Sequence, residues 1–191
     1  MDRESAQGSA YAYNAVAQAH GWSAYCDSRL DFQWQPFCAL HEIWDRARAD
    51  AALPQRTALT ARLLKDYLPC IAIYERFFEA DGTRRYRVRL VGTAYAQVYG
   101  ELTGKVVDQI VSGEKLLRFN TALDETLNSP APLRLIAAAD IPDKSFLSAE
   151  YFLAPLADAS GAPATILICA HFSGEKPWVE YLANTLVRLA G

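Results

Sequence analysis

Apolar residues first take up a regular spacing between Gln33 and Ala52. They recur there at three- and four-residue steps, and the large side chains of Trp34 and Trp44 lie on the resulting stripe. This spacing predicts an amphipathic helix, because residues three and four apart share one helical face. Leu53-Pro54 is expected to end the helix, since a residue that precedes proline avoids the helical conformation.

The segments before and after this helix show weaker patterns. A second helix is expected to begin near Thr57 and to end before Pro69, so residues 33–68 would form N-terminal flanking helices. Residues 1–32 are rich in Ala, Ser and Tyr and show little periodicity. They are therefore expected to form a poorly ordered lead-in, as chain ends often do.

Charge decides the register of a predicted hairpin that turns at Ala80-Asp81-Gly82. A two-residue turn would set Arg76 directly opposite Arg87, and the two positive charges would repel each other. A three-residue loop, with Gly82 in the left-handed conformation, sets Glu75 opposite Arg87 instead, and we favour this register. The positions that then share one mostly apolar face are Ala72, Tyr74, Tyr86, Val88 and Leu90, while Arg85, Arg87 and Arg89 lie on the other face.

The remaining pattern alternates between strands and helices. Strands are expected at 71–79, 83–91, 133–139, 149–156 and 165–172, and helices after Gly92, from Ser112 to before Pro130, and at 174–191. The helix at 174–191 carries an amphipathic stripe that includes Trp178. The last strand is apolar on both alternations, which is typical of a strand that is covered on both faces.

This order of elements predicts an α+β fold. Its core, at residues 69–173, would be a five-stranded antiparallel sheet with helices over one face. Because those helices cover one face only, either the helix with Trp34 and Trp44 or the helix with Trp178 must cover the other face. The N-terminal and C-terminal flanking helices are therefore expected to be integral parts of the fold.

Composition and charge exclude several classes of protein. The 191 residues suit one domain with additions, and a hydrophobic content of 51% is enough for a sizeable core. The net charge of −3 predicts no nucleic-acid partner, because such binding needs a basic face. No apolar run approaches the roughly 20 residues that span a bilayer, and the acidic N-terminus is unlike a signal peptide. We therefore expect a cytoplasmic protein without membrane contact.

The reactive side chains form no recognisable catalytic or metal-binding pattern. The four cysteines are widely spaced without a CxxC pair, so they are expected to be reduced, buried and inert. Among the three histidines only His171 lies in the predicted core, and a half-buried histidine is commonly structural. Glu150 with Asp140, and Glu75 with Glu79, could be drawn as carboxylate pairs, but partnership with arginines is the commoner use of such residues. The sequence therefore predicts no enzyme, no catalytic residue and no metal site.

Several short motifs follow one another in a distinctive order. They are Trp44, Leu53-Pro54-Gln55-Arg56, Leu68-Pro69, Tyr86 to Thr93, Leu102-Thr103-Gly104 and Leu153-Ala154-Pro155-Leu156. This succession runs from about Trp44 to Phe172, two thirds of the chain, and resembles the stand-alone bacterial PAS-domain family. The resemblance implies a PAS fold, often dimeric, with a cavity between the sheet and the helices.

The cofactors of PAS subclasses can be tested against these residues. Haem-binding members use an axial ligand, usually a histidine, on the helices over the sheet, and residues 57–170 contain no histidine. Tyr95 and Tyr99 remain as alternative haem ligands. Flavin photoreceptors carry an adduct-forming cysteine on the helical segment, and residues 92–139 contain no cysteine. Haem bound through histidine and a covalent flavin adduct are therefore not expected, and the cofactor is left unknown.

The residues expected to line the cavity lie on the apolar strand face and the facing helices. They are Tyr74, Tyr86, Val88, Tyr95, Tyr99, Phe119, Leu123 and Tyr151, with Phe152 in place of Tyr151 if the strand phase is shifted. Several tyrosines around one space would suit an aromatic or polar-headed ligand, because each buried hydroxyl needs a partner. A filled core with those hydroxyls satisfied by backbone or water is the alternative.

Two arginines are candidate contacts for an anion. Arg89 is expected to make a salt bridge on the outer face of the sheet rather than to face the cavity. Arg118 is expected on the solvated side of its helix, because the apolar stripe of that helix is formed by Leu116, Phe119 and Leu123.

Two functions are compatible with this sequence. In the first, the protein is a sensor in which a small molecule fills the cavity and changes a dimer or partner surface. In the second, it is an interaction module with a closed core that binds another signalling protein. Small residues at Ala137, Ala139 and Ala170 would favour the sensor, and dense aromatic filling with an exposed apolar patch would favour the module. Because only a short helix lies between Phe172 and Gly191, we expect the output to act on a partner in trans. A homodimer that forms through a flanking helix is also expected.

Overall fold

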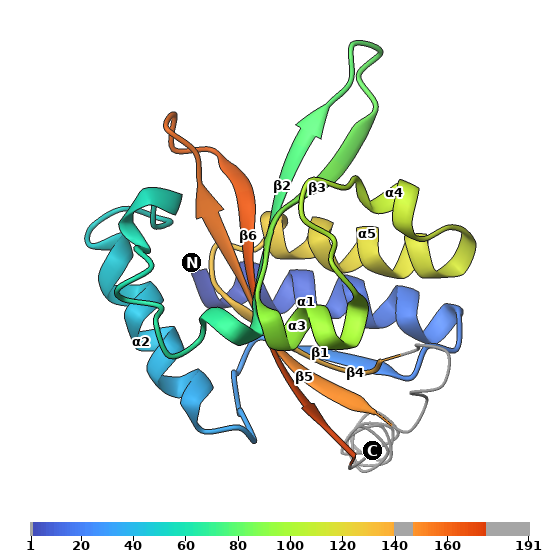
Figure 1. The fold of residues 1–191 in the computed structure, drawn as a ribbon, viewed down its shortest axis with the longest axis horizontal. Helices are drawn as coiled ribbons and strands as arrows, with labels where there is room; N and C mark the ends of the chain where they lie inside the picture. The colour runs from blue at the N-terminus through green and yellow to red at the C-terminus, as the bar shows by residue number, and fades with distance from the viewer. Residues whose placement is uncertain (1, 140–146, 175–191) are drawn as a thin grey trace.

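The structure, a computed structural model, describes residues 2–139 and 147–174 (Figure 1). The helices are α1 (Asp2–Ala19), α2 (Pro36–Arg48), α3 (Thr93–Tyr99), α4 (Val107–Ile110) and α5 (Gly113–Asn128), with 3₁₀ turns η1 (Arg56–Ala58) and η2 (Leu68–Cys70). The strands are β1 (Ala24–Asp27), β2 (Ile71–Phe78), β3 (Arg84–Val91), β4 (Leu133–Ala138), β5 (Ser148–Ala157) and β6 (Pro163–Ser173).

The described strands form one antiparallel sheet in the order β1-β4-β5-β6-β2-β3. The five expected strands are present as β2 to β6, and the predicted α+β class is confirmed. β1 adds a sixth strand beside β4, in a segment that the sequence pattern did not assign to the sheet.

Helices cover both faces of this sheet. Helices α1, α3, α4 and α5 lie together over one face, which we call the inner face, and α2 stands on the opposite side, over the outer face (Figure 1). Each face has its own hydrophobic core. Because helices cover both faces, the side chains on both faces of β6 are buried, which explains why this strand is apolar on both alternations.

The outer core is built around α2. Phe37, Leu40 and Trp44 are buried on one stripe of this helix and pack against sheet residues that include Phe152. The indole Nε1 of Trp44 donates a hydrogen bond to the carbonyl of Pro155 at 3.0 Å, so its polar atom is satisfied within the core. Of the two helices that were expected as alternative covers of this face, the one with Trp44 lies over it, and the one with Trp178 lies outside the described residues.

The expectation of a poorly ordered lead-in at residues 1–32 is wrong. Helix α1 buries a stripe of Ala6, Ala10, Tyr13 and Ala17, which recur at four-, three- and four-residue steps and belong to the inner core. Small side chains on this stripe allow the helix to lie close beside α5. The lead-in is therefore a structured part of the domain.

The hairpin register is the one that charge predicted, with Glu75 opposite Arg87 and Gly82 at a φ of 82°. One detail differs. Ile73 pairs with Leu90 and Tyr74 pairs with Val88, so Arg89 is the extra residue of a β-bulge. The bulge reverses the alternation beyond it, and Leu90 packs against the outer core instead of joining Tyr74 on the inner face.

The predicted second helix between Thr57 and Pro69 is also wrong. That segment consists of turns between η1 and η2, and its buried residues Leu59, Leu64 and Tyr67 belong to the outer core. The helix expected at 174–191, with Trp178, lies outside the described residues apart from its first position.

Candidate functional site

A cavity of about 230 Å³ lies between the inner face of the sheet and the helices. Its walls come from α1, α3, α4, α5 and from strands β2, β4, β5 and β6. The lining residues are Tyr13, Tyr74, Tyr95, Val98, Tyr99, Leu102, Val107, Ile110, Val111, Lys115, Arg118, Phe119, Ala122, Leu123, Leu135, Ala137, Ala139, Tyr151, Leu153 and Ile168.

Local periodicity places these side chains around one space. Tyr95 and Tyr99 are four residues apart on α3, and Phe119 and Leu123 are four apart on α5, so each pair shares a helical face. On the sheet, alternate residues of β4 and β5 point to the same face. The space remains open partly because Ala137, from β4, contributes so little volume to its wall.

The structure brings together most of the residues that the sequence indicated. The predicted residues that line the cavity are Tyr74, Tyr95, Tyr99, Phe119, Leu123, Tyr151 and Arg118. Arg118 was expected on the solvated side of α5, and that expectation is wrong, because α1 packs beside α5 and encloses this side of the helix. Ala137 and Ala139 line the cavity as well, whereas Ala170 is buried elsewhere in the inner core.

Three of the predicted residues lie elsewhere. Tyr86 is buried in the inner core, and its hydroxyl donates a hydrogen bond to Asp124 of α5 rather than facing the cavity. Val88 is fully buried in the filled part of the same core. The side chain of Arg89 is exposed at the bulge, with its Nε 3.7 Å from Glu75, as expected for a surface ion pair.

The sequence pattern missed one functional candidate in particular, Tyr13. It is 1% exposed and reaches the cavity from α1. The stripe of Ala6, Ala10, Tyr13 and Ala17 was the available signal, and it was weak because alanine is common on both faces of helices.

Tyrosine hydroxyls form pairs inside the cavity. The hydroxyls of Tyr74 and Tyr95 are 3.5 Å apart, and those of Tyr99 and Tyr151 are hydrogen-bonded to each other. Burial raises the pKa of Tyr74 to about 12, and burial likewise raises the pKa values of Tyr95 and Tyr99. These phenols are therefore neutral at physiological pH and are available as hydrogen-bond donors and acceptors.

A cationic region lies at one part of the cavity wall. Lys115 and Arg118 both line it from α5, and Nη2 of Arg118 donates a hydrogen bond to the carbonyl of Ala138 at 2.6 Å. The described lining contains no aspartate or glutamate. A mostly apolar chamber with a few convergent polar groups is the usual form of a small-molecule site.

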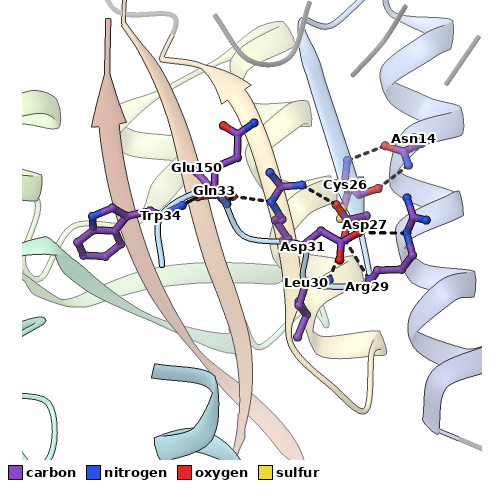
Figure 2. Close-up of polar contacts among 10 residues, drawn as sticks. Asn14, Cys26, Asp27, Arg29, Leu30, Asp31, Gln33, Trp34 and Glu150 are labelled. Carbon is purple, nitrogen blue, oxygen red and sulfur yellow. Dashed lines mark hydrogen bonds and ion pairs between the residues drawn. The ribbon is translucent and has the colours of Figure 1, made fainter. Parts of the chain in front are cut away.

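The outer face carries a separate, buried ion cluster. Arg134 of β4 lies between two carboxylates, with its Nε 2.5 Å from Glu150 and its Nη1 3.0 Å from Asp27, and all three residues are buried. Glu150 also accepts hydrogen bonds from the backbone N–H groups of Gln33 and Trp34 at 2.9 and 2.8 Å (Figure 2). The cluster thus joins β1 and β4 to the segment that enters α2.

The geometry around His171 does not form a catalytic group. Its ring stacks on that of Trp34, with centroids 4.8 Å apart and planes 3° from parallel. Burial lowers the pKa of His171, and nearby Glu150 opposes this effect in part. No set of three candidate ligands for a metal ion occurs within residues 2–139 and 147–174.

The four cysteines are free, and they differ in exposure. Cys26 and Cys169 are buried, Cys70 is half-buried and Cys38 is exposed. The expectation that all four are buried is therefore wrong for Cys38, which lies on the solvent side of α2. None of them lines the cavity.

Neither a histidine-ligated haem nor a covalent flavin fits this cavity. Its described lining contains no histidine and no cysteine. Tyr95 and Tyr99, the alternative haem ligands, are already engaged with other tyrosines. A cavity of roughly 150 Å³ holds one benzene, so 230 Å³ is far too small for a macrocycle such as haem.

Comparison with known proteins identifies the family. A model of the PAS domain matches residues 33–170, which is well over half of the chain. The chain therefore belongs to the PAS domain family. No curated protein matches the sequence. None of the helices within the described residues is long and apolar enough to cross a bilayer.

Among solved structures, the chain is similar to that of an RNA-binding light-oxygen-voltage receptor. The two share 13% sequence identity and superpose with a TM-score of 0.42. The match covers 70% of this chain and 38% of the receptor chain, so this chain corresponds to well under half of that protein.

Proposed function

We propose that this PAS domain protein is a non-enzymatic sensor that binds a small molecule in the cavity between the sheet and helices α1, α3, α4 and α5. The observation that supports this proposal best is the open volume of about 230 Å³ itself, walled by apolar and aromatic side chains and by a few polar groups. Protein interiors are otherwise close-packed, and few voids in them exceed the size of a water molecule.

The position of the cavity suits a sensor. A ligand there would touch α1 through Tyr13, α3 through Tyr99 and α5 through Phe119, together with the sheet. It would change the relative stability of arrangements in which these helices sit differently on the sheet, provided that it binds one arrangement better than another. The proposed output is an altered surface, read by a partner in trans or by a second copy of the chain in a homodimer.

A native mass spectrum of freshly purified protein, set beside the denatured spectrum, tests the proposal. An additional mass that disappears on denaturation is the expected result. A clean spectrum equal to the chain or to twice the chain would count against a resident ligand and favour a closed interaction module. Light scattering over a range of concentrations tests the dimer, and a monomer at all concentrations would refute that part.

A pair of variants links any bound mass to the cavity. Ala137→Leu places a larger side chain in the cavity wall and should abolish the bound mass. Ala15→Leu makes the same chemical change on the exposed side of α1 and should retain it. Equal retention by both folded variants would place the ligand elsewhere.

A further inference from the structure

We infer that the molecule bound in the cavity is a small organic acid, with an apolar body and one carboxylate that is held by Arg118 and Tyr13. The inference deepens the proposed function and rests on it. It concerns the chemical class of the ligand, which membership of the PAS family leaves open.

The charges of the cavity wall are the first argument. Arg118 contributes positive charge, and the described lining contributes no carboxylate to balance it. Arginine cannot lose its proton in a protein, so its charge must be met by solvent, by a counter-charge or by a ligand. Among the described residues Arg118 gives a hydrogen bond from Nη2 to Ala138, which leaves further N–H groups of its five for a carboxylate.

The hydroxyl of Tyr13 is the second argument. It is buried and makes no hydrogen bond of ordinary geometry with any described residue. More than nine in ten buried polar groups in proteins have a partner, so this hydroxyl indicates a group that belongs there. A neutral phenol can donate to a carboxylate oxygen.

The two groups lie at the same part of the cavity. Burial raises the pKa of Tyr13, and the neighbouring Arg118 guanidinium acts against that rise, as it does for the pKa of Tyr99 and Tyr151. The Arg118 charge thus lies near three phenols that line the same cavity. A carboxylate there would accept hydrogen bonds from a guanidinium and a hydroxyl, while an apolar ligand would leave the hydroxyl and the remaining guanidinium N–H groups without an acceptor.

The rest of the cavity limits the size and the chemical character of the apolar part of the ligand. Its other walls are aromatic or aliphatic, with Phe119, Leu123 and Ile168 among them. A cavity of roughly 150 Å³ accommodates benzene, so by proportion 230 Å³ accommodates about nine non-hydrogen atoms. An aryl or alkyl monocarboxylic acid of this size matches both the volume and the polar end.

The test compares an acid with its neutral isostere. Purified protein, freed of any resident ligand by refolding, is titrated with benzoate and with benzamide by calorimetry. The pair differs only in the head group, so apolar burial cancels. Because hydrogen bonds to charged groups exceed neutral ones, the acid should bind about tenfold or more tightly than the amide. Heptanoate and heptanamide repeat the comparison with an alkyl body.

Matched variants locate the recognition. Arg118→Met keeps the length of the side chain and should remove the preference for the acid, whereas Arg89→Met, at the exposed bulge, should leave it unchanged. Tyr13→Phe should weaken binding of the acid about fivefold, and Tyr11→Phe, on the exposed side of α1, should not. Far-ultraviolet circular dichroism confirms that each variant is folded before it is titrated.

The possible outcomes distinguish the acid class of the ligand, the role of Arg118 and the sensor proposal itself. Equal affinity for acid and amide in the unmodified protein overturns the acid assignment without any variant, and it leaves the sensor proposal intact. A preference for the acid that survives in folded Arg118→Met also overturns the assignment to this residue. Binding of no probe by protein that carries a resident mass overturns the acid class alone, and binding of no probe with a clean native spectrum counts against both proposals.

Discussion

The side-chain amide of Asn14 on α1 occupies both backbone hydrogen-bonding groups of Cys26 on β1. Its Nδ2 donates to the carbonyl of Cys26 at 2.7 Å, and its Oδ1 accepts from the Cys26 N–H at 2.8 Å (Figure 2). β1 is an edge strand, and its outward backbone groups would otherwise face water or another chain. One carboxamide thus takes the place of the missing neighbouring strand and fixes α1 to the sheet.

Replacement of Asn14 by leucine should therefore destabilise the protein by about 1–3 kcal/mol, because two backbone groups lose their partner. Asn14→Asp is the matched variant, since it keeps the acceptor for the N–H but removes the donor to the carbonyl. Urea unfolding gives the free energies, and hydrogen exchange should show faster exchange at Cys26 in the leucine variant. Equal stability of Asn14→Leu and the unmodified protein would contradict the assigned role.

Gly92 provides a second prediction, from a close approach between two backbones. A Cβ atom at this position would lie 2.0 Å from the carbonyl oxygen of Leu68 and 2.5 Å from that of Pro69. Gly92 also donates its N–H to Ile71 at 2.7 Å, so the segments cannot separate without loss of that bond. Gly92→Ala should cost roughly 3 kcal/mol or more, seen as a lower denaturant midpoint or as insoluble protein.

The control for this variant is Gly8→Ala, which should have the opposite sign. Gly8 lies inside α1, and a Cβ there would meet nothing within 4 Å. Alanine in a helix interior is favoured over glycine by about 0.5–1 kcal/mol, because glycine loses more backbone freedom on folding. If both variants shifted the denaturant midpoint in the same direction, the contact at Gly92 would not be the cause.

The sequence predicted much of the sheet because the signals there were local. Repulsion between Arg76 and Arg87 was enough to choose the hairpin register, and the double apolar alternation of β6 was enough to require cover on both faces. Leu90 was misplaced because alternation assumes an unbroken strand. The bulge at Arg89 depends on how β2 and β3 fit their neighbours, and nothing in the local pattern indicates it.

The candidate site was predicted in part, for a related reason. Periodicity indicates which side chains face the core, but it does not show where the core is left unfilled. Tyr86 and Tyr74 share the inner face, yet only Tyr74 reaches the cavity. Arg118 was predicted on the solvated side of α5 because apolar residues alone form the buried stripe of that helix. The sequence pattern did not indicate the contact between α5 and α1. Both errors arise from packing between elements distant in sequence.

Burial of His171, whose ring stacks on that of Trp34, makes stability depend on pH. Burial lowers the pKa of His171 in the folded protein below the value of about 6.5 that an unfolded histidine has. The unfolded state therefore binds more protons near that pH, so the free energy of unfolding rises with pH. The stabilisation is fully present above the unfolded pKa and declines as the pH falls below it.

Urea unfolding at about pH 7.5 and pH 5.5 should thus show lower stability at the lower pH. His171→Phe retains an aromatic ring against Trp34 and cannot titrate, so it should reduce the difference between the two measurements. The pKa of His41 is also lowered by burial. The variant His41→Gln therefore measures how much of the stability difference between the two pH values comes from His41. An unchanged difference in His171→Phe would show that this ring does not contribute.

Arg134 supports the last prediction, because among the described residues it pairs with both buried carboxylates, those of Asp27 and Glu150. Arg134→Met would leave both carboxylates buried without their counter-charge. The expected loss is about 3–5 kcal/mol in urea unfolding, which is the usual cost of breaking a buried ion pair by removal of one partner.

Removal of all three charges, on Arg134, Asp27 and Glu150, should recover stability only if oxygen atoms remain to accept the backbone hydrogen bonds. Asp27 accepts the backbone N–H groups of Arg29 and Leu30, and Glu150 accepts those of Gln33 and Trp34, so apolar replacements would leave four amides unpaired. Asp27→Asn and Glu150→Gln remove the charge and keep one acceptor oxygen each. Arg29 and Leu30 share one oxygen of Asp27, whereas Gln33 and Trp34 use separate oxygens of Glu150, so three of the four amides keep an acceptor. Combined with Arg134→Met, these two substitutions should regain part of the loss, whereas Asp27→Leu with Glu150→Leu should not. Equal stability of the two triple variants would mean that the carboxylates serve the arginine alone, and not the loops that lead into α2.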